Sequence, residues 1–264
     1  MSRKVLLSAN EAVAWAAFKA GCSVASAYPG TPSTEILENV AKFKDSIYCE
    51  WAVNEKVGME VAIGASIAGK RALTAMKHVG LNVALVPLMT YTYVGANGGF
   101  VIIICDDPGI HSSQNEQDSR NLVKFARTPL FEPSDSQETF DMVLEAFEVS
   151  ERFQVPVFVR LTTRTSHTST VVDVGDDCGP THIEGKGYVK DLKRYVAVPM
   201  NARVHKLKSK DRTEVLSKFA SDHPQNRIEA GDKRIGIITG GITYQYVREV
   251  FPEFSTLKIG RAHV

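Results

Sequence analysis

The sequence predicts an α/β fold: a parallel sheet with helices on both of its faces. Apolar runs of strand length alternate with segments of helical periodicity from Met1 to about Val174. The strand segments, such as Phe100–Cys105, are apolar throughout instead of at every second residue. Strands that are buried on both faces need such runs, which are typical of a parallel sheet between two layers of helices.

Start and stop signals locate the individual elements in order. Ser8–Glu11 (Ser-Ala-Asn-Glu) matches a capping box, so a helix is expected from there through Phe18, before Gly21. Asn54 is expected to cap a helix that continues to about Ala68. Further strands are expected at 23–28, 47–51, 72–76, 100–105, 130–131 and 155–161, and further helices at 35–43, 82–92, 118–126 and 136–153.

The alternation of strands and helices lapses after the first domain, residues 1–174. Residues 175–232 are charged, contain turn residues and include one expected helix, Thr213–Ala220, so we interpret them as an interdomain linker. Residues 233–258 then start a new strand–turn–helix unit with the helix Thr243–Val250. One strand and one helix cannot enclose a core, so we expect this unit to be the truncated start of a second α/β domain.

The final segment, residues 259–264, is distinguished by the nucleotide sequence that could encode it. Its residues, Ile-Gly-Arg-Ala-His-Val, can be encoded by the codons of a widely used short-read sequencing adapter. We interpret the segment as a sequencing-adapter artefact and expect the native sequence of this fragment to end near Lys258. No chemical role is assigned to Arg261 or His263.

Composition and charge argue against several classes of partner. The chain is 44% hydrophobic and 23% charged, which is typical of a globular protein. Its net charge of +1 gives no electrostatic argument for nucleic acid. No apolar run approaches the roughly 20 residues that span a membrane, and no signal peptide is recognisable. We therefore expect a cytoplasmic protein that binds neither nucleic acid nor membrane.

The four cysteines are Cys22, Cys49, Cys105 and Cys178, and no two of them form a Cys-x-x-Cys pair. Their spacing fits neither a zinc site nor an iron–sulfur cluster. We expect buried thiols in strands, and we expect no metal site and no redox centre within this chain.

Polar residues follow the carboxyl ends of the predicted strands. Thr31, Glu55 and His78 each come just after a strand, and so do Asp106-Asp107 and Arg164–His167. Ligands of open parallel sheets bind beyond the carboxyl ends of the strands, so these residues are expected to share one edge. The sequence therefore predicts a small-molecule site at that edge.

Each candidate also has an ordinary structural explanation. Thr31 can cap the following helix with Pro32 in its first turn, and the helix dipole favours Glu55 at a helix start. His78 is as readily a surface histidine or one with satisfied hydrogen bonds. Asn82 can cap the helix that follows it or reach the site.

Several motifs, taken in order, resemble the 2-oxoacid:ferredoxin oxidoreductase family, and above all its indolepyruvate-oxidising α subunits. The resemblance extends over residues 4–258, which correspond to the N-terminal part of such a subunit. The matching segments are Tyr28–Ser33, Asn54–Lys56, Met76–Asn82, Asp106–Gly109, Ser112–Asp118, Arg164–His167, Pro199–Arg203 and Gly240–Ile242. No single motif is decisive, but this many in order is specific.

The resemblance implies a thiamine diphosphate enzyme that oxidatively decarboxylates indolepyruvate or another arylpyruvate to the acyl-CoA, with ferredoxin as electron acceptor. The first domain would be its pyrimidine-binding domain. Glu55 would be the catalytic carboxylate and would bind the pyrimidine of the cofactor. Thr31 and His78 would bind the substrate, and Asn82 would bind the cofactor.

The resemblance also implies parts that this chain lacks. A further domain would hold Mg²⁺ and the diphosphate, and a C-terminal part would hold 4Fe-4S clusters. A β subunit carrying the γ-type domain would complete a hetero-oligomer, with ferredoxin and coenzyme A as further partners. The fragment alone is expected to be inactive.

Departures from the family pattern leave alternatives open. Pyruvate members carry an arginine near Asp106-Asp107, so the two aspartates here favour an arylpyruvate over a small 2-oxoacid. Arg164 and Lys77 are the candidates for the missing positive charge, and Glu50 and Glu60 compete locally for the carboxylate role. The alternatives are a subunit of another 2-oxoacid oxidoreductase or thiamine-dependent decarboxylase, or a non-catalytic pyrimidine-type binding module.

Overall fold

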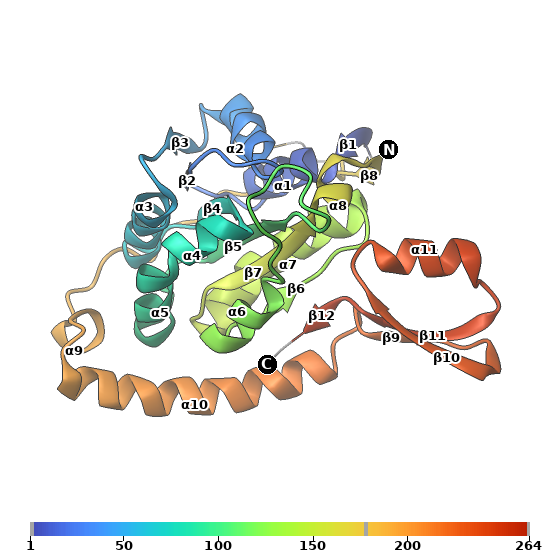
Figure 1. Cartoon of the computed structure of the whole chain (residues 1–264). Helices are drawn as coiled ribbons and strands as arrows, with labels where there is room; N and C mark the ends of the chain where they lie inside the picture. Colours follow the sequence, from blue (N-terminus) through green and yellow to red (C-terminus); the bar gives the residue numbers. More distant parts are fainter. Residues whose placement is uncertain (1–2, 177–178, 263–264) are drawn as a thin grey trace.

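The computed structural model describes residues 3–176 and 179–262 and centres on a seven-stranded sheet (Figure 1). The strand order is β12-β6-β7-β5-β4-β2-β3, and every neighbouring pair runs parallel except β12 and β6. The predicted parallel sheet is thus confirmed. Its strands are β2 (Val24–Ala27), β3 (Tyr48–Trp51), β4 (Ala72–Lys77), β5 (Phe100–Asp106), β6 (Leu130–Phe131), β7 (Val157–Thr162) and β12 (Arg261–Ala262).

Helices cover both faces of this sheet, and each face has its own apolar core. On β5, Val101 and Ile103 belong to the core beneath α1, α2 and α7, whereas Ile102 and Ile104 belong to the core beneath α3 to α6. The two cores explain the unbroken apolar run of this strand. The helices of this body are α1 (Ala9–Lys19), α2 (Thr34–Val40) with the 3₁₀ turn η1 (Ala41–Phe43), α3 (Glu55–Ile67), α4 (His78–Val83), α5 (Leu85–Val94), α6 (Arg120–Ala126), α7 (Ser136–Phe153) and α8 (Thr163–His167).

The body contains helices and strands beyond those predicted. The helix expected at 82–92 is two helices, because α4 already starts at His78 and the chain turns at Ala84 before α5. Two strands were not expected, β1 (Lys4–Ser8) and β8 (Ser169–Asp173), which pair antiparallel in a small sheet of their own.

Residues 179–226 contain far more helix than predicted. After the short helix α9 (Leu192–Tyr195), the helix α10 (Pro199–Ser221) runs for 23 residues beneath the body and packs against α5 (Figure 1). The predicted helix Thr213–Ala220 is only its C-terminal part. Arg212 fastens α10 to the body by donating hydrogen bonds to two backbone carbonyls, those of Thr92 and, at 2.9 Å, Gln154.

The C-terminal unit is a three-stranded sheet beside the body, with the order β10-β11-β9 (Figure 1). It consists of β9 (Arg227–Glu229), β10 (Asp232–Gly240), α11 (Thr243–Val250) and β11 (Phe254–Ile259), so it holds two strands more than were predicted. The chain then returns to the central sheet as β12. This pairing does not test the interpretation of residues 259–264 as an artefact, which stays a prediction, and residues 263–264 lie outside the described residues.

Cys22 and Cys105 are buried and Cys49 is partly buried, while Cys178 lies outside the described residues. Burial raises the pKa of the Cys22 thiol to about 12 and that of Cys49 to about 11. Within the described ranges, no group of three or more His, Cys, Asp or Glu side chains is arranged to hold a metal ion. No helix there combines the length and apolar character needed to cross a bilayer.

Candidate active site at the carboxyl edge of the sheet

Glu55 is the first residue of α3, a few residues beyond the carboxyl end of β3. Asn54 caps this helix as predicted, since its Oδ1 accepts a hydrogen bond of 2.9 Å from the Val57 N–H. The Glu55 side chain is partly buried and packs onto Gly80 of α4, where a Cβ atom would stand 2.7 Å from Glu55 Oε1. The structure therefore places this carboxylate at a helix start and against a second helix.

Thr31 lies in the turn between β2 and α2 and does not cap the helix. Ser33 takes the N-cap position and Pro32 precedes it, so the prediction of a Thr31 cap with Pro32 in the first turn is wrong. The helix starts later because two hydroxyls hold the chain in the turn. Thr34 Oγ1 accepts a hydrogen bond from the Gly30 N–H at 2.9 Å, and Ser33 Oγ donates to the Gly30 carbonyl at 2.7 Å. Thr31 itself is exposed.

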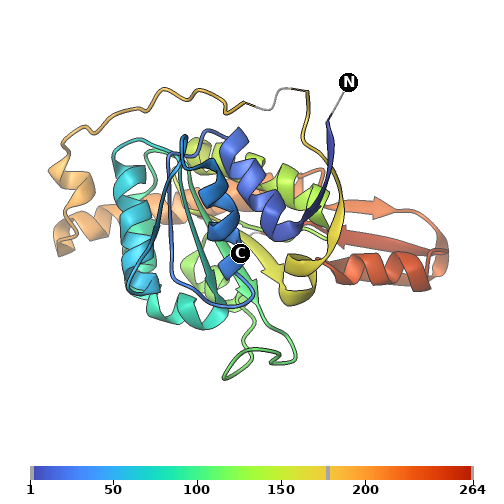
Figure 2. The same ribbon diagram turned by 90° about the horizontal axis from the view of Figure 1, so that it is seen from above.

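A long loop, residues 107–119, projects from the same edge of the body (Figure 2). Lys77, at the end of β4, donates a hydrogen bond of 2.7 Å from Nζ to the Ser112 carbonyl of this loop. Its methylene chain passes beneath the Thr31 turn, because a Cβ atom on Gly30 would lie 3.1 Å from Lys77 Cδ. Lys77 thus joins the β2–α2 turn to the long loop.

His78 and Asn82 of α4 also hold this loop. His78 is fully buried, and its Nε2 lies 3.0 Å from the Asn115 carbonyl, which can only accept a hydrogen bond. Its buried Nδ1 has no hydrogen-bond partner within the described residues. Asn82 does not cap α5; it is exposed, and its Oδ1 accepts a hydrogen bond of 2.8 Å from Gln117 Nε2.

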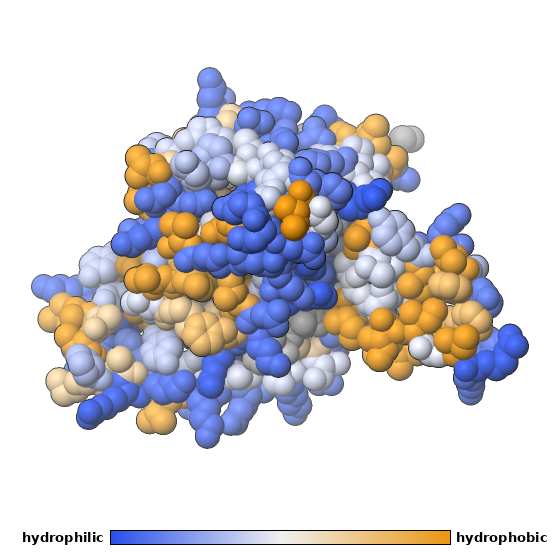
Figure 3. Space-filling view, viewed as in Figure 1, coloured by the Kyte–Doolittle hydropathy of each residue, from blue (hydrophilic) through white to orange (hydrophobic). Residues whose placement is uncertain are grey.

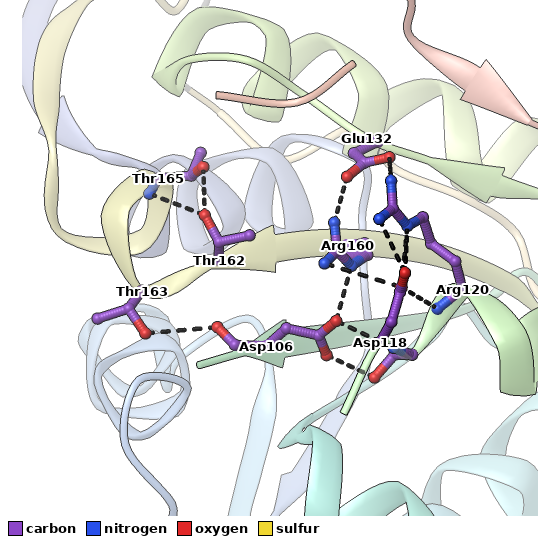
Figure 4. Close-up of polar contacts among 9 residues, drawn as sticks. Asp106, Asp118, Arg120, Glu132, Arg160, Thr162, Thr163 and Thr165 are labelled. Atoms are coloured by element: carbon purple, nitrogen blue, oxygen red, sulfur yellow. Dashed lines mark hydrogen bonds and ion pairs between the residues drawn. The ribbon is translucent and has the colours of Figure 1, made fainter. Parts of the chain in front are cut away.

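A network of charged side chains, with a buried centre and an exposed rim, lies at the other end of the loop around Arg160 of β7 (Figure 4). Arg160 contacts Asp106 at 2.8 Å and Glu132, and it lies 3.9 Å from Asp118. Arg120 contacts Asp118 at 2.8 Å and Glu132 at 3.8 Å. The sequence patterns did not predict this network, although a charged residue inside an otherwise apolar strand is a usable signal.

Asp107 is held ionised by hydrogen bonds. Burial by itself raises the pKa of its carboxyl, but the Ser112 N–H, the Ser113 hydroxyl and the Thr163 hydroxyl donate to it at 2.7, 2.7 and 2.8 Å. The net result is a pKa well below the ordinary value. Asp106 and Asp107 are therefore both engaged in internal contacts.

A cavity of about 720 Å³ lies between the long loop, α8 and the turn before α11. Figure 3 shows hydrophilic side chains gathered between the body and the C-terminal unit. Arg164 and His167 line the cavity, but Glu55, Thr31, His78 and Asn82 do not. Its lining residues are Pro108, His111, Glu116, Gln117, Asp118, Arg120, Glu132, Arg160, Thr162, Thr163, Arg164, His167, Thr168, Gly240, Ile242 and Thr243.

Comparison with known proteins identifies related sequences over nearly the whole chain. Residues 15–215 match the thiamine-diphosphate-binding region of pyruvate flavodoxin/ferredoxin oxidoreductases. The indolepyruvate oxidoreductase subunit IorA of Archaeoglobus fulgidus is 41% identical over 98% of this chain and 43% of its own length. The subunit of the same name from Pyrococcus abyssi is 46% identical over 93% of this chain and 39% of its own length.

More distant proteins share part of the sequence or only the fold. The ketoisovalerate oxidoreductase subunit VorB of Methanothermobacter thermautotrophicus is 28% identical over 58% of this chain and 46% of its own length. The 2-oxoglutarate:ferredoxin oxidoreductase of Magnetococcus marinus superposes with a TM-score of 0.79 at 18% identity, covering 98% of this chain and 54% of that one. This last likeness confirms the α/β fold.

Proposed function

The chain belongs to the thiamine-diphosphate-binding family of pyruvate flavodoxin/ferredoxin oxidoreductases, and we propose that it forms the pyrimidine-binding part of a 2-oxoacid oxidoreductase. The relatives named for indolepyruvate are more similar than the one named for ketoisovalerate, which supports indolepyruvate or another arylpyruvate as substrate. The product would be the acyl-CoA, and the electrons would pass to ferredoxin.

The position of Glu55 is the observation that carries this proposal. Thiamine diphosphate, when bound, supplies a nucleophilic carbon for attack on the 2-oxo group of the substrate. Glu55 would hold a proton on its carboxyl and share it with the N1′ atom of the pyrimidine ring. Its partly buried place at a helix start, at the sheet edge where open α/β folds bind ligands, fits that task.

Thr31 and Lys77 would meet the substrate. Thr31 is exposed at the turn above Lys77, and a hydroxyl can both donate and accept a hydrogen bond. Lys77 uses one ammonium hydrogen on the Ser112 carbonyl and retains two further donors for a carboxylate. Lys77 is therefore better supported than Arg164 as the missing positive charge, because Arg164 lines a cavity that Thr31 does not reach.

His78 and Asn82 remain candidate ligand-binding residues, and their contacts support an indirect way of acting. Both are tied to the 107–119 loop, His78 through the Asn115 carbonyl and Asn82 through Gln117. We propose that His78 and Asn82 contribute to substrate and cofactor binding chiefly by holding this loop in place at the border of the site. Loops at sheet edges commonly carry function in this way.

The complete enzyme would require more than this chain, which spans 43% of the Archaeoglobus fulgidus relative and 39% of the Pyrococcus abyssi relative. The family resemblance supports the proposal that a further domain holds Mg²⁺ and the diphosphate and that a C-terminal part holds 4Fe-4S clusters. A partner subunit with the γ-type domain, coenzyme A and ferredoxin would complete the system. We propose a cytoplasmic hetero-oligomer.

Replacing the carboxyl of Glu55 by an amide tests the proposal. In the complex assembled from the full-length polypeptide and its partner subunit, Glu55→Gln should lower indolepyruvate-dependent ferredoxin reduction by at least about 100-fold. Glu60→Gln is the matched control, because Glu60 is exposed on the same helix and should leave turnover unchanged. Retained turnover in Glu55→Gln removes Glu55 from the role. A cofactor-binding wild-type complex without turnover on any 2-oxoacid supports a binding module instead.

A further inference from the structure

Gly80 lies in direct contact with the Glu55 side chain. A Cβ atom built on Gly80 would stand 2.7 Å from both Cγ and Oε1 of Glu55 and 3.0 Å from its carboxyl carbon. Carbon contacts have their optimum at about 3.5–4.0 Å, so a methyl group here and the present carboxylate cannot both be accommodated. Any side chain at position 80 displaces Glu55 from the position it has in this structure.

The backbone gives no separate reason for a glycine at position 80. Gly80 is in the middle of the helix α4 and is not among the glycines with positive φ. Alanine is favoured over glycine inside a helix, so the local conformation alone would prefer alanine. The contact with Glu55 is therefore the reason to have no side chain at position 80.

Glu55 cannot relieve the clash through its backbone. Asn54 caps α3 at its start, and one turn later Gly58 packs on β2, where a Cβ atom would lie 3.4 Å from the Ala27 Cα. The helix is thus held at both ends of its first turn. Only rotation of the Glu55 side chain makes room, and that rotation moves the carboxylate away from α4.

We propose that Gly80 is a positioning residue that sets the location of the Glu55 carboxylate. The role assigned to that carboxylate rests on the proposed function, whereas the contact between the two residues does not. A side chain at position 80 would leave a folded protein whose carboxyl group is out of place. Misplacement of a reacting group by about 1 Å can cost 100-fold in rate.

A stability cycle on the 264-residue chain tests the contact without any cofactor. Gly80→Ala should leave the melting temperature unchanged or lower it. In the Glu55→Ala background the same change should raise it by about 2 °C, because only the helix preference for alanine then remains. The control is Gly64→Ala in α3, where a Cβ atom meets nothing within 4 Å. It should raise the melting temperature in both backgrounds.

The role in catalysis is tested in the assembled full-length complex. Gly80→Ala should lower kcat for indolepyruvate by about 10–100-fold with little change in KM, and Gly64→Ala should not.

Equal melting shifts of Gly80→Ala in both backgrounds, or full kcat in the single variant, would overturn the inference. A wild-type complex without turnover would instead contradict the proposed function, and the stability cycle would still decide whether the contact exists.

Discussion

At the residue scale, Asp107 shows how a buried carboxylate is kept ionised. Hydrogen bonds, among them those from Ser112, Ser113 and Thr163, lower its pKa in the folded protein although burial opposes them. In the unfolded chain the group titrates near its ordinary value of about 3.9. The carboxylate therefore stabilises the fold fully above that pH, and this contribution is lost progressively as the pH falls through it towards the folded-state pKa.

We expect Asp107→Asn to reduce both the stability and its dependence on pH. At pH 7 the loss should be about 1–3 kcal/mol, because an amide cannot accept all three hydrogen bonds. The free energy of unfolding from urea melts between pH 7 and pH 3 should fall less steeply in the variant than in the wild type. Asp45→Asn is the control on an exposed aspartate. Parallel curves for the wild type and Asp107→Asn would contradict the expectation.

At this scale, the features that depend on residues close together in the sequence were predictable. The Ser8–Glu11 capping box and the Asn54 cap are present as predicted, because a cap joins residues that are three apart in sequence. The prediction that Thr31 caps the helix was wrong, because hydrogen bonds between the Ser33 and Thr34 hydroxyls and the Gly30 backbone delay the helix start. The contact between Glu55 and Gly80 joins distant residues, and no local pattern predicts it.

At the element scale, the three strands of the C-terminal unit have two unlike faces. Ile238 of β10, Leu257 of β11 and Ile228 of β9 stand side by side in the register, so they share one face. Ile238 is 74% exposed and Ile228 is 76% exposed. On the opposite face Lys258 is fully buried, pairs with Glu138 of α7 and lies 4.2 Å from the Tyr244 ring centre. The covered face is thus charged and the open face aliphatic.

We expect a lysine on the open face to remove apolar surface at little cost in stability. Ile238→Lys should change the free energy of unfolding by less than about 0.5 kcal/mol, because the side chain is exposed. It should also lower the binding of a hydrophobic fluorescent dye by the folded chain. Leu6→Lys, an exposed leucine on β1, is the control and should lower dye binding less. A large loss of stability in Ile238→Lys would show that this face is covered.

Elements were predictable where one segment carries its own signal. The helices Ser136–Phe153 and Thr243–Val250 were predicted to the residue, because apolar residues recur on one face or clear turn signals bound the segment. The strands β1 and β8 were missed because their pairing joins distant parts of the chain. Most of α10 was missed because its few buried residues leave a charged and exposed helix without a clear apolar stripe.

At the scale of the whole molecule, the parallel sheet and its two helical layers follow from alternating apolar segments, whereas the order of the strands and the C-terminal arrangement do not. The return of the chain to β6 as β12 depends on the partner strand and has no signature of its own. The cavity between the long loop and the turn before α11 likewise exists only because two distant segments meet. Sequence patterns describe single segments, so they do not predict contacts that form only when two distant segments meet.

The proposed division of the cofactor site between this chain and a further domain leads to an expectation about binding. This chain would contact the pyrimidine through Glu55, whereas the further domain would hold the diphosphate and Mg²⁺. Calorimetric titration of the 264-residue chain with thiamine diphosphate and Mg²⁺ should therefore show no saturable binding up to about 1 mM. A dissociation constant of that size corresponds to a binding free energy of about −4 kcal/mol. The assembled full-length complex is the positive control. Micromolar binding by this chain alone would mean that it holds the diphosphate as well, and the two-part site would have to be abandoned.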